Sequence, residues 1–376
     1  MRLLYVTDAL AVHGGLERVL VEKANWLVAH GGFEVCLLTV NQGDHPICFP
    51  LHPDVSYDDL DIRFYQQYHL PFWKRPIINH KLHLQFRKKL SRRLQETTPD
   101  VIICTRLDYV CDIVRIKGII PLVFESHSCR LACRFEGDSM LRRIHVWYLQ
   151  LAVRKADMVV ALTKGDADEW RKLTSKVSVI PNVVHLNVSD TFSDCTSKSA
   201  IYVGRFSKQK DVVSLLCIWN LVHKRHPDWS LNIFSGYGEE QDTLLDIIRQ
   251  MGTNIRVYRP TSDIIEKYKE SSILLLTSRY EPFGLVIPEA MSCGLPVIVF
   301  DCPYGPAEII TDYVDGILIK DRNIEDFVEK VCQLMECEPM RQRMGKRAVE
   351  SSQRYQKDKI MLKWLKLFEG FLDYSK

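Results

Sequence analysis

The feature that most constrains this chain is a series of short apolar segments that show no alternation between apolar and polar residues. The segments fall into two groups, at residues 3–7, 35–40, 101–104, 122–124 and 158–162, and at residues 200–203, 230–234, 255–258, 273–277 and 296–300. Longer polar or helically spaced stretches separate them, a pattern typical of buried parallel strands joined by crossover helices. We therefore predict an α/β protein built from two doubly wound, Rossmann-like domains.

A polar segment separates the two groups of predicted strands. Residues 188–199 are rich in Ser, Thr and Asp, and they follow the turn-prone tripeptide Ile180-Pro181-Asn182. We place the linker there. The prediction is an amino-terminal domain over residues 1–187 and a carboxy-terminal domain over residues 188–354.

The last segment, residues 355–376, carries apolar side chains at helical spacing among lysines. A helix with one broad apolar face needs a surface to pack against. We expect this helix to return to the amino-terminal domain.

The charge balance and the hydropathy exclude several classes of protein. The 376 residues include 50 Lys and Arg against 47 Asp and Glu, so the chain lacks the global positive field of non-specific nucleic-acid binders. No segment approaches about 20 uninterrupted apolar residues, so we expect no transmembrane helix. Asp8 interrupts what would be the apolar core of a signal peptide. We expect a cytoplasmic protein with no nucleic-acid partner.

A pair of glycines follows the first predicted strand. Gly14 and Gly15 open an amphipathic helix, and glycine lets backbone N–H groups approach an anion at a helix amino terminus. A tight strand-to-helix turn explains the pair equally well. The motif is not Gly-x-Gly-x-x-Gly, and the second strand ends at Val40-Asn41 without the acid that would hold an adenosine ribose. These departures count against a nicotinamide enzyme.

Two cations follow the first strand of the second domain. Arg205 and Lys210 lie in the loop after residues 200–203, where a guanidinium and an ammonium can neutralise a diphosphate leaving group. A second glycine turn, from Gly236 to Glu239, follows the next strand and resembles a nucleotide-binding loop, although structural turns look the same.

The most informative stretch runs from residue 278 to residue 297 and holds two carboxylates eight residues apart. We place Glu281 in a loop after a strand and Glu289 on the helix that follows. With this spacing, the first carboxylate can reach a sugar hydroxyl while the second accepts hydrogen bonds from a ribose. The backbone N–H groups of Phe283, Gly284 and Leu285 lie at the start of the same helix.

Together these motifs resemble those of GT-B glycosyltransferases of the retaining family 4. The marks of that family include two glutamates separated by seven residues, a Gly-Gly turn in the first domain and a Gly-Arg…Lys segment in the second, and all three occur here in order. The likeness extends to residues 301–308 and to Asp315-Gly316. It implies two domains that face each other across a cleft, with the nucleotide-sugar donor mainly on the second and the acceptor on the first.

The resemblance also implies roles for single residues. The implied donor site comprises Gly15, Arg205, Lys210, Gly236, Glu281, Phe283, Gly284, Leu285 and Glu289. Within it, Arg205 and Lys210 would grip the diphosphate. Glu281 would bind the hydroxyls of the transferred sugar, and Glu289 would bind the ribose. Gly15 would lie close to the phosphate and the acceptor.

His127 follows the strand at residues 122–124, at a strand's carboxyl end, where α/β proteins build their sites. It resembles the first-domain histidine that approaches the sugar in this family, although a lone histidine is often a structural hydrogen-bonding group. The implied catalytic residues are therefore Glu281, His127, Arg205 and Lys210. The implied reaction retains the anomeric configuration: the nucleoside diphosphate departs and the acceptor hydroxyl attacks on the same face, without a dedicated protein base.

No metal or cofactor is expected. The other common glycosyltransferase architecture holds a divalent ion with an Asp-x-Asp motif, and Asp59-Leu60-Asp61 has that form. It lies in a polar stretch early in the chain, and we interpret it as an exposed loop.

A basic run spans residues 74–93, with eight Lys and Arg and no Asp or Glu. Interspersed leucines and Phe86 would make it a basic amphipathic surface attracted to anionic lipid, which favours peripheral contact with the inner face of the membrane. An ordinary solvated helix face explains the same composition.

The sequence thus favours a metal-independent glycosyltransferase that moves a hexose from a nucleoside-diphosphate sugar, with UDP preferred, to a glycan or lipid-linked acceptor in polysaccharide or lipopolysaccharide synthesis. Two alternatives stay open. One is an NAD(P)-dependent oxidoreductase, and the other is a catalytically silent subunit that binds a sugar nucleotide.

Overall fold

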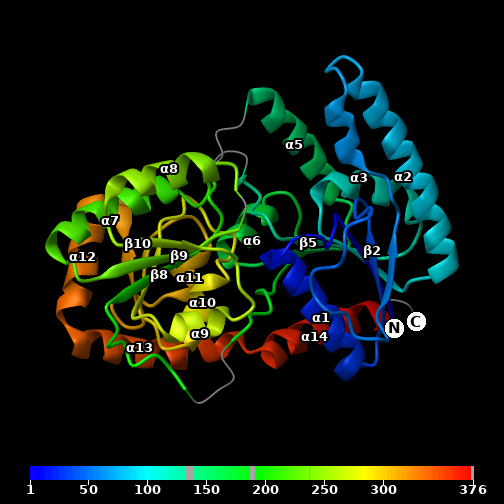
Figure 1. Cartoon of the computed structure of the whole chain (residues 1–376). Coiled ribbons are helices and arrows are strands. Elements are labelled where there is room, and N and C mark those ends of the chain that lie inside the picture. The colour runs from blue at the N-terminus through cyan, green and yellow to red at the C-terminus, as the bar shows by residue number, and fades with distance from the viewer. Residues whose placement is uncertain (133–138, 187–190, 237, 374–376) are drawn as a thin grey trace.

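Two parallel β-sheets, one in each half of the chain, organise the computed structural model, which describes residues 1–132, 139–186, 191–236 and 238–373. Figure 1 shows the two halves side by side. The first sheet has the order β3-β2-β1-β4-β5-β6-β7 and the second the order β10-β9-β8-β11-β12-β13. The strand pairs within both sheets are parallel. This topology confirms the predicted pair of Rossmann-like domains.

All but three of the strands, β3, β7 and β13, coincide closely with the predicted apolar segments. Those of the first sheet are β1 (Arg2–Thr7), β2 (Glu34–Thr39), β3 (Ser56–Asp59), β4 (Val101–Cys104), β5 (Leu122–Ser126), β6 (Met158–Ala161) and β7 (Val177–Val179). Those of the second are β8 (Ser199–Val203), β9 (Ser230–Phe234), β10 (Ile255–Tyr258), β11 (Ile273–Leu276), β12 (Val297–Phe300) and β13 (Gly316–Ile319). Central strands such as β4 and β11 are buried at every position because helices cover both faces.

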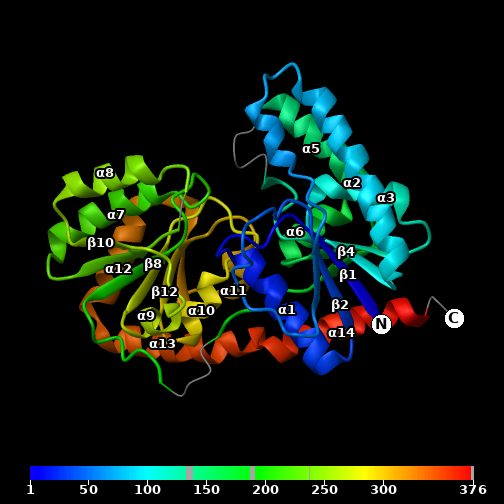
Figure 2. The same ribbon diagram turned by 45° about the vertical axis from the view of Figure 1, so that its right-hand side comes forward.

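Helices flank both sheets (Figures 1 and 2). In the first domain they are α1 (Gly15–Gly31), η1 (Phe64–His69), α2 (Arg75–Thr97), α3 (Leu107–Ile116), α5 (Met140–Val153) and α6 (Lys164–Arg171). The second domain contributes α7 (Val212–Arg225), α8 (Gln241–Met251), α9 (Ile264–Lys269), α10 (Val286–Ser292), α11 (Gly305–Ile309), η2 (Lys320–Arg322), α12 (Ile324–Glu336), α13 (Glu338–Ser352) and η3 (Gln353–Tyr355). Among the described helices, none combines the length and apolar character needed to cross a bilayer.

The final helix, α14 (Lys357–Asp373), packs against the first domain as predicted. The ring of Phe368 lies 5.7 Å from that of Phe33 just after α1, and the Trp26 indole donates a hydrogen bond of 2.7 Å to Asp358. Figure 2 shows α14 running beneath α1 and the first sheet. Because α13 and α14 follow each other below both domains, the carboxy terminus joins the two halves a second time.

The exact domain boundaries remain predictions. The predicted break between residues 187 and 188 falls within residues 187–190, which lie outside the described residues. The structure starts the last helix at Lys357, two residues after the predicted position.

Candidate active site

The loops at the carboxyl ends of the two sheets meet between the domains. A Cβ atom added to Gly15, the first residue of α1, would lie only 2.8 Å from a side-chain carbon of Leu285, at the start of α10. Nearby, the Glu308 carboxylate of the second domain accepts hydrogen bonds of 2.9 and 2.8 Å from the backbone N–H groups of Lys164 and Gly165. The starts of α1 and α6 thus abut the second domain. Glycine suits position 15 because a side chain there would meet Leu285.

Glu281 is fixed by contacts on both its backbone and its side chain. It lies in the loop after β11, where Gly305 donates a backbone hydrogen bond of 2.9 Å to its carbonyl oxygen. The residue is 3% exposed, and its carboxylate accepts from the Lys210 ammonium at 2.5 Å and from the Ser278 hydroxyl at 2.6 Å. The structure therefore brings together two of the predicted catalytic residues, Glu281 and Lys210.

A second charged pair braces the loop that carries Lys210. The Arg322 guanidinium donates to the Asp211 carboxylate and also to the carbonyl oxygens of Thr277 and Ser278, at 3.1 and 2.9 Å. It thereby ties the loop after β8 to the loop after β11. This brace was not predicted from the sequence, because Arg322 follows a different strand, β13, which was not predicted either.

Glu289 is buried on α10 and is bound by residues from both domains. Arg18, on α1 of the first domain, forms an ion pair with one carboxylate oxygen, and the Tyr268 hydroxyl donates to the other at 3.3 Å. Burial raises the pKa of Glu289, and the Arg18 charge acts against that rise. Arg18 was not singled out from the sequence, although it lies three residues after Gly15 in the same helical turn.

Gly284 and Phe283 shape the turn between the two glutamates. Gly284 has a φ of +90°, a backbone conformation that side chains rarely adopt. Phe283 is buried, with its ring 5.4 Å from that of Tyr355. The turn is thus anchored in the core of the second domain, and Leu285 is carried to the contact with α1.

Arg205 contrasts with these buried groups, because its side chain is exposed and forms no ion pair with any described residue. Its charge reaches Glu17 on α1: burial raises the pKa of Glu17, while Arg205 and His127 oppose the rise. Glu17 therefore lies near both of these predicted site residues, and it was not singled out from the sequence.

The glycine turn after β9 adjoins the Arg205 loop. Gly238 lies so close to the backbone of Phe206 that an added Cβ would come within 2.2 Å of its carbonyl oxygen. Gly236 lies against Pro260, 3.4 Å from where its own Cβ would be. Residue 237 lies outside the described residues. No described contact joins Gly236 to the other predicted donor-site residues.

His127 follows β5 and belongs to a buried charged network of the first domain. Its Nε2 lies 3.1 Å from Oε1 of Glu125, which also accepts a hydrogen bond of 2.5 Å from the Lys23 ammonium. Burial alone would raise the pKa of Glu125, but Lys23 and His127 outweigh it and hold the pKa at about 2. The Lys23 ammonium lies 4.0 Å from the ring centre of Trp364 on α14. The network thus links the last helix to His127.

The Asp-x-Asp motif is not the exposed loop that was expected from the sequence. Asp59 ends strand β3, and its carboxylate accepts hydrogen bonds of 2.8 Å from the Thr39 hydroxyl and 3.1 Å from the Gly43 N–H. Leu60 between the two acids is buried, and Asp61 alone is exposed. The edge strand explains the difference: pairing with β2 gives the Asp59 side chain structural partners. The described residues contain no cluster of three or more His, Cys, Asp or Glu suited to a metal ion.

Two protein-family models match the chain and meet near the linker. The model described as Glycosyltransferase Family 4 matches residues 13–188, and the model described as Glycosyl transferases group 1 matches residues 189–351. Together they include every cleft residue described above.

Curated relatives match over nearly the whole length. An uncharacterised glycosyltransferase of Haemophilus influenzae is 27% identical over 359 residues, which cover 93% of this chain and 95% of the relative. The amylovoran biosynthesis glycosyltransferase AmsD of Erwinia amylovora is 28% identical over 378 residues, which cover 96% of this chain and 98% of the relative.

Solved structures share the fold at low identity. A mutant of S. aureus TarM, in complex with Fondaparinux, alpha-GlcNAc-glycerol and UDP, superposes with a TM-score of 0.78 and 15% identity, covering 98% of this chain and 99% of that one. The apo form of the lipopolysaccharide outer core galactosyltransferase WaaB superposes with a TM-score of 0.68 and 18% identity, covering 100% of both chains. The two-domain architecture predicted from the sequence is confirmed.

Proposed function

Because the chain belongs to the family 4 glycosyltransferases of GT-B fold, we propose that it transfers a hexose from a UDP-sugar, with retention and without a metal, to a hydroxyl of a glycan or lipid-linked acceptor. The relatives support a role in cell-surface polysaccharide synthesis, since they include the amylovoran enzyme and a lipopolysaccharide 1,6-galactosyltransferase of Escherichia coli. The TarM mutant and Anabaena HepE, whose structures contain UDP, support the choice of nucleotide.

One observation carries the proposal: the second domain holds two cations and a buried carboxylate beside the start of α1. Arg205 is exposed and unpaired among the described residues, whereas Lys210 is positioned by Glu281 at 2.5 Å. A diphosphate bound by Arg205 and Lys210 would be neutralised by two cations of the same loop. The amino terminus of α1, whose first residue Gly15 leaves room for close approach, adds the positive end of a 17-residue helix.

The same arrangement suits departure of a nucleoside diphosphate. Negative charge develops on the diphosphate as the bond to the sugar breaks, and Arg205 and Lys210 stabilise that charge in place. Glu281, freed in part from Lys210 when the phosphate binds, accepts hydrogen bonds from the sugar hydroxyls. Glu289, held by Arg18, accepts hydrogen bonds from the ribose. The acceptor hydroxyl then attacks the same face that the diphosphate leaves.

His127 is proposed to approach the sugar from the first domain. Its Nε2 lies 3.1 Å from the Glu125 carboxylate, and Glu125 is itself neutralised by Lys23. A histidine in this position can donate a hydrogen bond to the donor sugar or the acceptor. Because the two cations would supply the electrostatic stabilisation, the proposed reaction needs no divalent ion.

Peripheral contact with an anionic membrane through residues 74–93 is part of the proposal. Four of the eight cations contact their own domain: Arg75 bonds the Leu70 carbonyl oxygen, Arg87 bonds Asp112, Lys89 bonds the Leu60 carbonyl oxygen and Arg93 bonds Asp58. The other four are exposed and recur on the outward side of α2, at positions 74, 81, 88 and 92. That stripe supports long-range attraction to anionic lipid.

The proposal is tested by thermal unfolding in EDTA with UDP, GDP, ADP, NAD and NADP, and with sugar nucleotides of each series. A ligand at 100 times its dissociation constant adds about 2.7 kcal/mol of stability, which raises Tm by several degrees. We expect UDP and UDP-sugars to stabilise without metal. Stabilisation by NAD or NADP alone would contradict the proposal and favour an oxidoreductase. UDP-sugar binding without transfer to any glycan acceptor would favour a catalytically silent subunit.

A further inference from the structure

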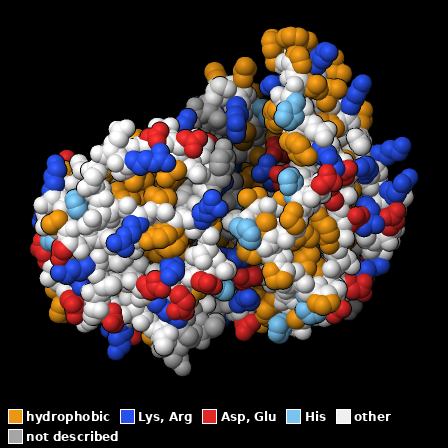
Figure 3. Space-filling model, viewed as in Figure 1, with side chains coloured by type: hydrophobic (Ala, Val, Ile, Leu, Met, Phe, Trp, Pro, Cys, Tyr) orange, Lys and Arg blue, Asp and Glu red, His pale blue; other side chains and the backbone are white. Residues whose placement is uncertain are grey.

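Two exposed apolar patches lie at the end of the first domain that faces away from α14 (Figures 1 and 2). The tip patch spans the end of η1 and the first turn of α2 and consists of Tyr68, Phe72, Trp73 and Ile77. The α5 patch covers the first half of α5 and consists of Met140, Leu141, Ile144, Trp147 and Tyr148. In Figure 3 hydrophobic side chains gather at the ends of both projections. Exposed apolar surface of this kind marks an interaction site.

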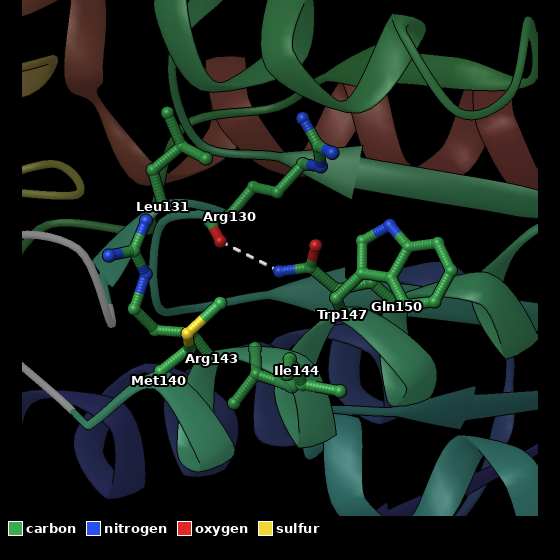
Figure 4. Close-up of a pocket in the computed structure, with 8 residues that line it drawn as sticks. Arg130, Leu131, Met140, Arg143, Ile144, Trp147 and Gln150 are labelled. Carbon is green, nitrogen blue, oxygen red and sulfur yellow. Dashed lines mark hydrogen bonds between the residues drawn. The ribbon is translucent and has the colours of Figure 1, made fainter.

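The first half of α5 carries one broad apolar face. Met140, Ile144 and Trp147 line a pocket of about 340 Å³ together with Leu131 (Figure 4), while Leu141, further round that face, is 81% exposed. Arg142, Arg143 and His145 lie on the remaining sides, so this segment is amphipathic, and the apolar face of an amphipathic helix normally packs against another surface. Here the described residues bury only the second half, from Leu149 onward. The first half therefore presents apolar surface that something outside the described chain must cover.

Both patches carry cations and lie in stretches of the sequence that are free of acids. Residues 62–95 and residues 139–148 contain no Asp or Glu. Lys74 adjoins the tip patch, and Arg143 lies at the pocket of the α5 patch. A partner that complements this surface must be apolar and negatively charged together.

We propose that the tip patch and the α5 patch together dock the first domain on an anionic phospholipid bilayer. Both carry a Trp and a Tyr, residues favoured at the boundary between headgroups and acyl chains. Both combine them with Lys or Arg, as interfacial segments do. Two separate projections of the same composition at one end of a domain fit a broad, continuous surface better than a single protein groove. The basic stripe of α2 then attracts the anionic lipid, and the apolar side chains of the two patches insert into the bilayer.

The docking surface adjoins the acceptor side of the cleft. The loop that leaves His127 reaches Arg130 within three residues, and the Arg130 carbonyl oxygen accepts a 2.7 Å hydrogen bond from Gln150 of α5 (Figure 4). A lipid-linked acceptor in the bilayer would therefore enter next to His127. The role given to this surface, delivery of a lipid-linked acceptor, rests on the proposed function. The vesicle-binding test does not depend on it.

The test is flotation with vesicles of phosphatidylcholine alone or mixed with phosphatidylglycerol, using the full chain without donor or acceptor. We expect the wild type to bind the anionic vesicles and to bind neutral vesicles far more weakly. The pairs Phe72→Ser/Trp73→Ser and Leu141→Ser/Tyr148→Ser should each lower the partition coefficient by roughly tenfold or more. Lys74→Gln and Arg143→Gln should each lower it by about fivefold on anionic vesicles only.

Ile119→Ser is the matched control, because Ile119 is 99% exposed in the loop between α3 and β5, away from both patches. It should bind vesicles like the wild type, and UDP should stabilise all variants equally. The inference would be overturned if Ile119→Ser lost as much vesicle binding as the patch variants. It would also be overturned if the patch variants bound vesicles like the wild type. A wild-type dimer in sedimentation velocity that the patch variants convert to monomers would overturn it as well, since a second copy would then cover the patches. A failure of UDP to bind any variant would count against the proposed function alone.

Discussion

The two halves of the cleft use charge in opposite ways. In the first domain, Lys23 and Glu125 neutralise each other inside the protein beside His127, and Lys23 is only 1% exposed. In the second domain, Arg205 is exposed and unpaired among the described residues, and Lys210 keeps 16% of its side chain exposed beside Glu281. The first half uses its charges to hold a histidine in position, whereas the second half keeps cations available to a ligand.

This difference predicts that substitutions in the two halves fail in different ways. A change in the first-domain network should lower the stability of the fold. A change in the second-domain group should leave the fold intact and lower binding or turnover. Arg18 stands between the two cases, because it belongs to the first domain and pairs with Glu289 of the second.

The largest effect is expected from Lys23→Met. The substitution leaves the Glu125 carboxylate buried without its ammonium partner, which should lower the free energy of unfolding by about 3–5 kcal/mol. Urea unfolding followed by circular dichroism measures it. The control is the double variant Lys23→Met/Glu125→Leu, which also removes the unpaired carboxylate and should restore much of the lost free energy of unfolding. A double variant no more stable than the single one would show that the pair is not the source of the effect.

Glu281→Ala comes next and should affect turnover only. Because the proposed contact is to the transferred sugar, we expect roughly a 100-fold or greater loss of transfer, or about 2.7 kcal/mol. UDP binding should persist, since Lys210 loses only its carboxylate partner and keeps its charge. Initial rates and calorimetric UDP titration give the two quantities. Arg205→Gln is the comparison variant and should weaken UDP binding as well; equal loss of UDP binding in Glu281→Ala would contradict the assigned role.

The smallest effect is expected from Arg18→Gln, which should weaken UDP binding about tenfold at neutral pH, or about 1.4 kcal/mol. Burial raises the pKa of Glu289, and Arg18 opposes the rise, so its loss raises that pKa further. The carboxylate that accepts ribose hydrogen bonds is then depleted at low pH and restored as the pH increases. Calorimetric titration across the pH range should show affinity recovering at higher pH.

Arg18→Lys keeps the charge and should retain most of the affinity. Tyr268→Phe removes a hydrogen bond that lowers the pKa of Glu289, so it should shift the pH dependence in the same direction as Arg18→Gln but by less. A uniform loss at every pH in Arg18→Gln would indicate that Arg18 only holds the domains together.

Most of the fold could be predicted from the sequence because buried parallel strands leave a strong local pattern. The three strands that were not predicted, β3, β7 and β13, all lie at sheet edges and span only three or four residues. An edge strand pairs on one side only, so its composition is less constrained, which explains β3 but not β13, whose sequence Gly-Ile-Leu-Ile carried an apolar signal that was not used. Strand β3 reads Ser-Tyr-Asp-Asp and carries no apolar signal apart from Tyr57.

The candidate site was predictable where a local motif places the chemistry. Glu281, Glu289, Arg205 and Lys210 stand out because they lie in short motifs after predicted strands that resemble those of the family. Lys23 left a weaker signal that could have been used: it stands among Leu20, Ala24 and Leu27 on the buried side of α1, where a charge requires a buried partner. The identity of that partner, Glu125, is not encoded near it.

By itself, the sequence determined the class of fold and the order of the two domains, and it yielded a set of predicted donor-site residues, because strand burial and loop motifs depend on neighbours a few residues apart. Only the tertiary structure decided which charges are neutralised and which stay available. Ion pairs such as Arg18 with Glu289, 271 residues apart, form through the packing of one domain on the other. A local sequence pattern cannot predict a pairing between residues so far apart in the chain. The pairs form only when the two domains pack against each other.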